Sequence, residues 1–192
     1  MTSHLDILRS MTFCVVDVET TGLAARRDRI TEIAAVRVEN LSLSGMSFTS
    51  LVNPGCRIPT LITELTGIDD AMVRAAPVFG EIAIGLRAHL EGAVIVAHNA
   101  SFDMAFLREE YARLGDTFAP THILDTVSLS RRVLPGLSQY KLTSLCQHLH
   151  IKPGMHRAVG DALATAELFL HLARRDPAAL TKKLRIPERA SC

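Results

Sequence analysis

FCVVDVETTGL, residues 13–23, decides the fold of this chain. An apolar, strand-like run carries two carboxylates, Asp17 and Glu19, two positions apart, and then breaks at Gly22. Because side chains at i and i+2 of a strand point to the same face, both acids should lie side by side at the end of a buried strand. Two ionised carboxylates that close together repel each other unless a cation lies between them. A metal site and a strand end with two solvated acids are both open from this stretch alone.

The composition is that of an ordinary globular protein with one domain. The chain has 192 residues, of which 48% are hydrophobic and 21% charged, enough for a full hydrophobic core. Its formal net charge is +1, so any basic surface that meets nucleic acid has to be local. The dinucleotide-binding pattern G-x-G-x-x-G and the phosphate-binding pattern G-x-x-x-x-G-K-[ST] do not occur. Neither of these nucleotide-binding classes is supported by the sequence.

The cysteines do not predict a metal or disulfide framework. They lie far apart, at positions 14, 56, 146 and 192, and form neither a C-x-x-C pair nor a zinc-type cluster. Residues 1–10 lack the apolar segment of a secretory signal, and no apolar run approaches the length needed to cross a bilayer. We therefore expect reduced thiols in a soluble, cytoplasmic protein with no membrane partner.

Five segments have the composition of β-strands: residues 12–18, 30–38, 43–52, 93–97 and 122–125. The second and third should pair antiparallel, because the connection between them is too short for a crossover helix. The wholly apolar run 93–97 has the pattern of a buried parallel strand.

Helices are expected around these strands. Periodicity and turn residues predict them at residues 60–66, 69–74, 77–90, 101–114, 126–133, 142–149 and 158–174, with a short helix or arm over 1–10. This order predicts an α/β fold with a mixed central sheet, antiparallel edge strands and helices on both faces. We divide the chain into an N-terminal arm (1–11), one domain (12–176) and a short C-terminal tail (177–192), which is a short helix or a loose segment.

Two further polar groups stand at the start of predicted helices. HNASFD, residues 98–103, directly follows the buried strand, and Asp103 falls in the first turn of the next helix. HRAVGD, residues 156–161, places His156 on a loop and Asp161 in the first turns of the last helix. Sites in parallel α/β sheets collect at the carboxyl ends of strands. Each group also has a plainer explanation, because an acid in a first turn complements the helix dipole and a loop histidine is often only solvated.

Together, the three groups follow the order of the motifs of one known family. They match D-x-E-T-T-G-L, H-N-A-x-F-D and H-x-x-x-x-D, and the chain resembles the DnaQ-like, or DEDDh, family of 3′–5′ exonucleases. LTGI (65–68) before AP (76–77), and LDT (124–126), also resemble family segments, so the resemblance covers about residues 12–174. It implies a ribonuclease-H-like α/β fold and hydrolysis of single nucleotides from a 3′ end. Histidine at position 156, where a sister subfamily has tyrosine, is typical of the histidine branch.

The resemblance also implies a site with two divalent ions, Mg²⁺ or Mn²⁺. Four converging acids would not all stay ionised at neutral pH without a metal, and oxygen ligands without cysteine favour Mg²⁺ or Mn²⁺ over zinc. Asp17 is expected to bridge both ions, Glu19 and Asp161 to complete the site of the nucleophilic water, and Asp103 to support the second ion through water. His156 is expected to take the proton from that water, since an imidazole pKa of about 6.5 suits a base at neutral pH.

Substrate contacts are expected around the same point. Leu65 and Phe102 are candidates to sandwich the terminal base, because stacking tolerates every base. Thr20 and its turn are expected to bind the 3′-hydroxyl through backbone groups. His98 and Asn99 are expected to brace the site.

The sequence leaves open the roles of four charged residues between positions 125 and 141. Arg131, Arg132 and Lys141 either meet the phosphates of the incoming strand or form a solvated surface. Asp125 either supports the site or has a structural role.

The favoured substrate is the 3′ end of single-stranded DNA, in proofreading or repair. An RNA-trimming enzyme would share this core, because DNA and RNA differ at the 2′-hydroxyl. A non-catalytic scaffold would have lost a carboxylate, whereas all four are present, and a phosphoesterase of free nucleotides would act on mononucleotides. The chain most resembles proofreading subunits or domains of bacterial replicative polymerases, so a DNA polymerase is a candidate partner. Only residues 175–192 follow the last predicted catalytic helix, so we expect no long extension for binding it. The sequence predicts no oligomeric state.

Overall fold

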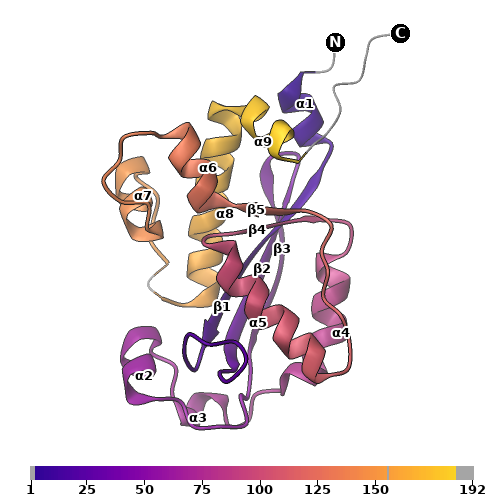
Figure 1. Ribbon diagram of the computed structural model, residues 1–192, viewed down its shortest axis with the longest axis vertical. Helices are drawn as coiled ribbons and strands as arrows, with labels where there is room; N and C mark the ends of the chain where they lie inside the picture. The colour runs from indigo at the N-terminus through magenta and orange to yellow at the C-terminus, as the bar shows by residue number, and fades with distance from the viewer. Residues whose placement is uncertain (1–2, 155, 185–192) are drawn as a thin grey trace.

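A five-stranded mixed sheet forms the centre of the computed structural model, which describes residues 3–154 and 156–184 (Figure 1). Its strand order is β3-β2-β1-β4-β5, with β1 at Thr12–Thr20, β2 at Ile30–Glu39, β3 at Ser42–Leu51, β4 at Val94–Ala97 and β5 at Ile123–Asp125. The first three strands pair antiparallel, and β4 and β5 run parallel to β1. The α/β fold with antiparallel edge strands is confirmed.

Nine helices of the described residues surround this sheet. They are α1 (His4–Arg9), α2 (Thr60–Thr66), α3 (Asp70–Val73), α4 (Phe79–Leu90), α5 (Ala100–Arg113), α6 (Thr126–Val133), α7 (Leu142–Leu149), α8 (Ala158–Arg175) and α9 (Pro177–Lys183). Helices α6, α7 and α8 cover one face of the sheet, and α4 and α5 cover the other (Figure 1). Helices on both faces are therefore confirmed.

One predicted helix start is wrong. The fourth helix begins at Phe79 and not at Pro77. The carbonyl of Pro77 accepts a hydrogen bond from the Asn53 backbone amide at 2.9 Å, which holds this segment extended beside the chain that leaves β3. Val78 then caps the helix, because its amide donates to the Glu81 carboxylate at 2.8 Å.

Alternation along β1 sorts its side chains between two cores. Phe13 and Val15 point into the core beneath α8, where the rings of Phe13 and Phe169 lie 4.7 Å apart. Cys14, Val16 and Val18 point into the other core, beneath α4 and α5. Because side chains alternate, the next odd-numbered positions of β1 project toward α8. Asp17 and Glu19 occupy those positions.

The first and last helices of the described chain, α1 and α9, pack side by side against the same core. Helix α1 contributes the buried Leu8, and Leu180 of α9 is buried in the same core. The His4 Nδ1 and Thr181 Oγ1 atoms lie 2.8 Å apart across the two helices. Residues 185–192 of the expected tail lie outside the described residues, and the division of the chain at 11/12 and 176/177 stays a prediction. None of the described helices is long and apolar enough to cross a membrane.

Candidate active site

Three carboxylates from two elements meet at the end of β1. Asp17 and Glu19 come from the strand, and Asp161 comes from the first turn of α8. One oxygen of each carboxylate lies within 4.8 Å of the others. The donors are all hard oxygens, and their spacing fits one divalent metal ion. The acidic cluster defined by these three residues could therefore hold a metal.

Small side chains bring α8 this close to the sheet. Ala158 and Ala162 of the helix pack on Ala34 and Val36 of β2, and all four are buried. Alanine at these positions lets the first turns of α8 approach the strands, which places Asp161 beside the end of β1.

A fourth carboxylate, Asp103, stands beside the acidic cluster. It lies in the first turn of α5, is 3% exposed, and accepts a hydrogen bond from the Val18 amide at 3.2 Å. Burial raises the pKa of Asp103 to about 8, although hydrogen bonds from its own amide and from Val18 act in the opposite direction. Asp103 thus approaches the cluster from the opposite core.

The cluster is short of positive charge. Burial, followed by the charges of neighbouring acids, raises the pKa of Asp17 well above its ordinary value. Burial and the charges of Asp161 and Glu32 raise the pKa of Glu19 to about 7, against an opposing effect of Arg157. Burial also raises the pKa of Asp161. A cation would relieve this repulsion and release protons from these groups.

His156 stands two residues before the start of α8 and is exposed. Its backbone has φ of 56°, in the left-handed region that few non-glycine residues adopt. Its charge and its backbone amide, which donates a hydrogen bond to Asp161, both act to lower the pKa of that carboxyl, against the larger effect of burial. The predicted base and the acidic cluster are therefore neighbours.

Sequence reasoning missed Glu32 and Arg157. Glu32 lies opposite Glu19 in the β1–β2 pairing and is 7% exposed. The Arg157 guanidinium donates to it from Nε at 3.0 Å and from Nη2 at 2.6 Å, and the Ala158 amide donates at 2.9 Å. The available signal was an acid near the start of the apolar strand 30–38, since a buried charge needs a partner.

The turn after β1 is built by its own hydrogen bonds. Thr20 is buried, and its hydroxyl donates to the Gly22 carbonyl at 2.6 Å. The Asp28 carboxylate accepts from the Ala24 amide at 2.8 Å and lies where a side chain at Gly22 would collide with it. This closed turn presents Leu23 to solvent, 84% exposed.

Helix α5 fixes the far end of the same turn. Glu110 is 2% exposed and accepts from Arg29 at 2.8 and 3.0 Å. Arg113 lies 3.1 Å from the same carboxylate and also donates to the Ala25 carbonyl at 2.8 Å. No local pattern in the sequence predicts this network.

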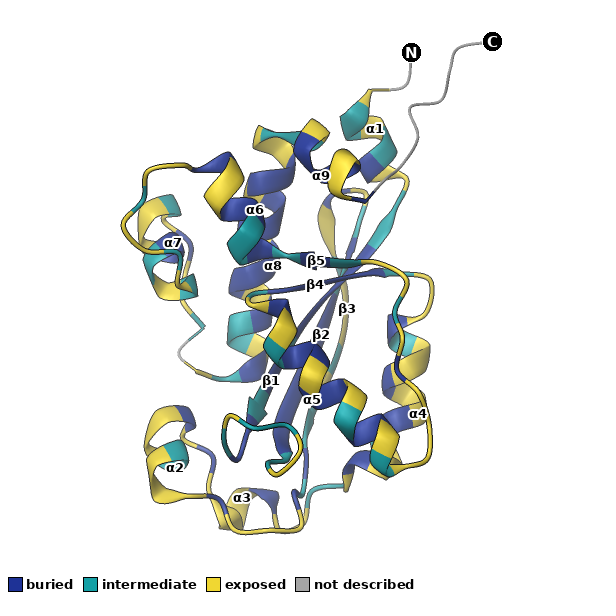
Figure 2. Cartoon of the chain, in the orientation of Figure 1, coloured by how far each residue is buried: buried dark blue, intermediate teal, exposed yellow. Residues whose placement is uncertain are grey.

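The predicted base-contact residues belong to different elements. Leu65 is 54% exposed on α2, a helix whose surface is mostly exposed (Figure 2). That region packs through a small separate cluster of Ile58, Ile68 and Val73. Phe102, at the start of α5, is half-buried with its ring 4.9 Å from that of Phe106.

His98 and Asn99 join neighbouring segments. The His98 ring lies 2.8 Å from the Thr126 hydroxyl and 3.1 Å from the Tyr140 carbonyl, and burial lowers its pKa. The Asn99 amide donates to Asp125 at 3.0 Å. The same Asp125 carboxylate caps α6 through the amides of residues 127 and 128.

The three predicted basic residues lie beyond this junction. All three are exposed, and Arg131 stands over the Tyr140 ring at 5.7 Å. Their role toward phosphate stays a prediction.

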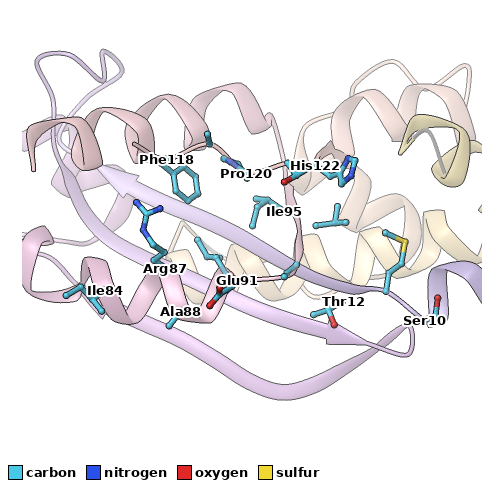
Figure 3. Close-up of a pocket in the computed structure, with 17 residues that line it drawn as sticks. Ser10, Thr12, Ile84, Arg87, Ala88, Glu91, Ile95, Phe118, Pro120 and His122 are labelled. Carbon is cyan, nitrogen blue, oxygen red and sulfur yellow. The ribbon is translucent and has the colours of Figure 1, made fainter. Parts of the chain in front are cut away.

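A groove of about 880 Å³ lies at the other end of the strands (Figure 3). Thr12 and Val94, the first residues of β1 and β4, line it together with α4 and residues 118–122. None of the residues predicted for the site lines it. Because the acidic cluster lies at the carboxyl end of β1, the groove is separate from the candidate site.

Several curated proteins are similar in sequence to this chain. The chain is 43% identical over 164 residues to the DNA polymerase III PolC-type of Caldanaerobacter subterraneus subsp. tengcongensis, covering 85% of this chain and 12% of that protein. It is 44% identical to a DNA polymerase III subunit epsilon-like protein of Rhodobacter capsulatus, covering 86% and 24%, and 40% identical to the 3′-5′ exonuclease DinG of Bacillus subtilis, covering 85% and 18%. The chain thus spans less than a quarter of the length of these relatives.

Among solved structures, exonuclease X in complex with 5′ overhanging duplex DNA superposes with a TM-score of 0.68 at 28% identity, covering 84% of this chain and 91% of that one. Escherichia coli exonuclease I with a dT13 oligonucleotide has the same fold, with a TM-score of 0.79 at 20% identity, covering 90% and 43%. The family model for exonucleases of the RNase T type matches residues 14–169. The chain therefore belongs to this exonuclease family, the DnaQ-like group that its motifs indicated.

Proposed function

We propose that this protein is a metal-dependent 3′–5′ exonuclease that removes nucleotides from the end of single-stranded DNA as nucleoside 5′-monophosphates. The observation that carries the proposal is the meeting of Asp17, Glu19 and Asp161, whose oxygens lie within 4.8 Å of one another. Membership of the exonuclease family and the neighbouring Asp103 and His156 support it.

The acidic cluster and Asp103 together would hold two divalent ions, Mg²⁺ or Mn²⁺. Asp17 would be shared between them, Glu19 and Asp161 would complete one site, and Asp103 would support the other through water. Carboxylate oxygens without a nearby thiolate ligand suit these hard ions. Bound there, the pair would supply the positive charge that stabilises the attacking and leaving oxygens of an in-line displacement at phosphorus.

His156 would act as the general base. An imidazole nitrogen takes a proton from water, whose oxygen forms a bond to the terminal phosphorus. The bond from that phosphorus to the 3′ oxygen of the preceding nucleotide breaks, and this oxygen takes a proton from solvent, which leaves a shortened strand with a 3′-hydroxyl. Asp161, which accepts a hydrogen bond from the His156 backbone amide, lies close enough to stabilise the imidazolium.

The strand end would be held by apolar and backbone groups. Leu65 and Phe102 would stack on the terminal base. The exposed Leu23 stands in the turn after β1. Thr20 and the backbone groups of this turn would bind the 3′-hydroxyl. His98 and Asn99 would keep the start of α5, and so Asp103, in place. Contacts of this kind do not depend on base identity.

DNA is favoured over RNA because the similar exonuclease X was solved with duplex DNA and the similar curated proteins are named as DNA polymerase III components. We propose proofreading or repair as the task, with a DNA polymerase as the candidate partner. Co-purification with a polymerase would separate proofreading from stand-alone repair.

The test is degradation of 5′-labelled single strands of matched DNA and RNA sequence by the purified protein, with a mononucleotide substrate in parallel. We expect a ladder that shortens from the 3′ end of DNA in Mg²⁺ or Mn²⁺ and no products in EDTA. Faster degradation of RNA would show that RNA is the preferred substrate. Release of phosphate from mononucleotides would show that the protein is a phosphoesterase of free nucleotides. An intact 3′ end under all metal conditions would exclude the proposed function.

A further inference from the structure

The ion pair between Glu32 and Arg157 holds the chain on one side of His156. Glu32 is buried on β2, directly opposite Glu19. Two guanidinium nitrogens of Arg157 bind it in a forked arrangement at 3.0 and 2.6 Å. The same carboxylate accepts the Ala158 amide at 2.9 Å. One buried acid thus fixes both the residue that follows His156 and the first amide of α8.

A close backbone contact holds the chain on the other side. Gly154 lies against Gly160 and Asp161 so closely that a side chain at position 154 would collide with the Asp161 amide. A side chain at Gly160 would in turn collide with the Gly154 carbonyl. Both positions therefore need glycine.

His156 stands between these two anchors in an unfavourable conformation. Its φ of 56° lies in the left-handed region, and its side chain is exposed, so its own packing does not hold it there. Such a conformation persists only where the surroundings impose it. The fork at Arg157 and the contact at Gly154 restrain the chain on either side, and the hydrogen bond from the His156 amide to Asp161 adds a third restraint.

We propose that Glu32 and Arg157 are positioning residues, whose forked pair fixes the backbone of His156 beside the acidic cluster. The consequence for catalysis rests on the proposed function, because it takes His156 as the base. The planar guanidinium suits this task, since two parallel hydrogen bonds set a direction as well as a distance, whereas a lysine ammonium is a point charge.

A purely structural role is the alternative that a test has to exclude. Removing one partner of a buried pair destabilises a protein by itself, because the other charge is left without a partner. A second pair on the same strand provides the control, because Arg37 Nε lies 3.2 Å from Glu39 Oε1 and neither residue belongs to the site. Glu39→Gln disturbs that pair and leaves the Glu32 fork intact.

The first measurement is independent of activity. Nuclear magnetic resonance of the labelled protein reports the φ of His156 through its amide–Hα coupling and Cα shift. We expect the left-handed signature in the parent and in Glu39→Gln, and its averaging toward ordinary values in Arg157→Met. If Arg157→Met does not fold, Arg157→Lys keeps the charge without the fork and should show the same loss. An unchanged signature in a folded Arg157 variant would overturn the proposal.

The second measurement is a double-mutant cycle on single-stranded DNA. Arg157→Met should lower kcat by about 10- to 100-fold in the parent, since misplacing a catalytic group is this costly. In a His156→Asn background, which tolerates the left-handed backbone, it should lower kcat by less than about threefold, because the residue it acts through is gone. Equal factors in both backgrounds would show that Arg157 does not act through His156.

Adding Glu32→Gln to Arg157→Met separates positioning from stability. The double substitution removes the unpaired charge, so the melting temperature should recover while kcat stays low. Recovery of kcat along with the melting temperature would assign the pair a structural role only. A parent that degrades no 3′ end would refute the proposed function, and the magnetic resonance result would still decide whether the pair fixes His156.

Discussion

The two halves of the candidate site are built in different ways. The acidic cluster stands on β1 and α8, and buried alanines of α8 pack on Ala34 and Val36 of β2. The base-contact half stands on α2, the turn after β1 and Phe102 at the start of α5. Leu23 and Leu65 are exposed there, and only a small satellite core lies beneath α2. Figure 2 shows the contrast between the buried α8 and the exposed α2.

This difference separates chemistry from recognition. Ion ligands need fixed positions, and elements with a large buried surface open least often. Stacking on a base tolerates variation in position, so a less packed helix suffices for it. Substitutions in the first half should therefore change the chemical step, and substitutions in the second half should change substrate binding.

The largest effect is expected at Asp17. Asp17→Asn should lower the rate of hydrolysis by about 10³-fold or more, since several kcal/mol of metal-dependent stabilisation are lost. The same substitution should raise the melting temperature of the metal-free protein, because it removes a buried acid whose neighbours raise its pKa. Rate assays and thermal melting in EDTA measure the two effects. Asp116→Asn, at an exposed acid paired with Arg87 at 2.7 Å, is the control and should change neither. A lower melting temperature for Asp17→Asn would contradict the electrostatic account.

The next largest effect is expected at His156. His156→Asn should lower kcat by about 10²- to 10⁴-fold, as expected for loss of a general base, while Mn²⁺ binding is nearly unchanged. Single-turnover kinetics and calorimetry measure the two quantities. His122→Ala, an exposed histidine at the separate groove, should have the parent rate. Activity at the parent level in His156→Asn would remove His156 from the mechanism.

Leu65 tests the recognition half. Leu65→Ala should raise KM for single-stranded DNA by about 5- to 100-fold with kcat almost unchanged, since stacking on one base contributes about 1–3 kcal/mol. The matched control is Leu43→Ala on the edge strand β3, where the leucine is 39% exposed. A fall in kcat without a change in KM would show that Leu65 acts in the chemical step, which would contradict the division of the site into a chemical half and a base-contact half.

The smallest effect is a pH dependence of stability. Carboxyls with raised pKa values bind more protons in the folded protein than in the unfolded chain at any pH between their ordinary and their folded pKa. Stability therefore falls as pH rises toward the folded values of about 7 for Glu19 and about 8 for Asp103, and levels off above them. The metal-free protein should lose about 2–5 °C in melting temperature between about pH 6.5 and pH 9. Added Mg²⁺ should reduce this loss. A melting temperature that rises over this range in EDTA would contradict the raised pKa values.

Much of this fold was predictable because its signals are local. Apolar runs, turn residues and the D-x-E spacing lie within one strand or helix, so the five strands and the side-by-side placement of Asp17 and Glu19 follow from them. The approach of Asp161 was expected only from the order of the family motifs. The partner of Glu32 lies 125 residues away, and nothing in the strand identifies Arg157 as that partner.

Other features also depend on distant segments. The network of Glu110 with Arg29 and Arg113 links α5 to the turn after β1, across 81 residues of sequence in the case of Arg29. Helix α4 begins at Phe79 and not at the predicted Pro77, because the Asn53 amide donates a hydrogen bond to the Pro77 carbonyl. Local patterns predict elements, and long-range polar pairs appear only when the elements are packed.

The most direct test is calorimetry of Mn²⁺ binding to the metal-free protein at neutral pH, with a nucleoside 5′-monophosphate present. We predict saturable uptake of the ion with release of protons by the parent, and loss of that uptake in Asp161→Ala. No uptake by the parent, or equal uptake by Asp161→Ala, would contradict the claim that α8 and β1 together form a metal site.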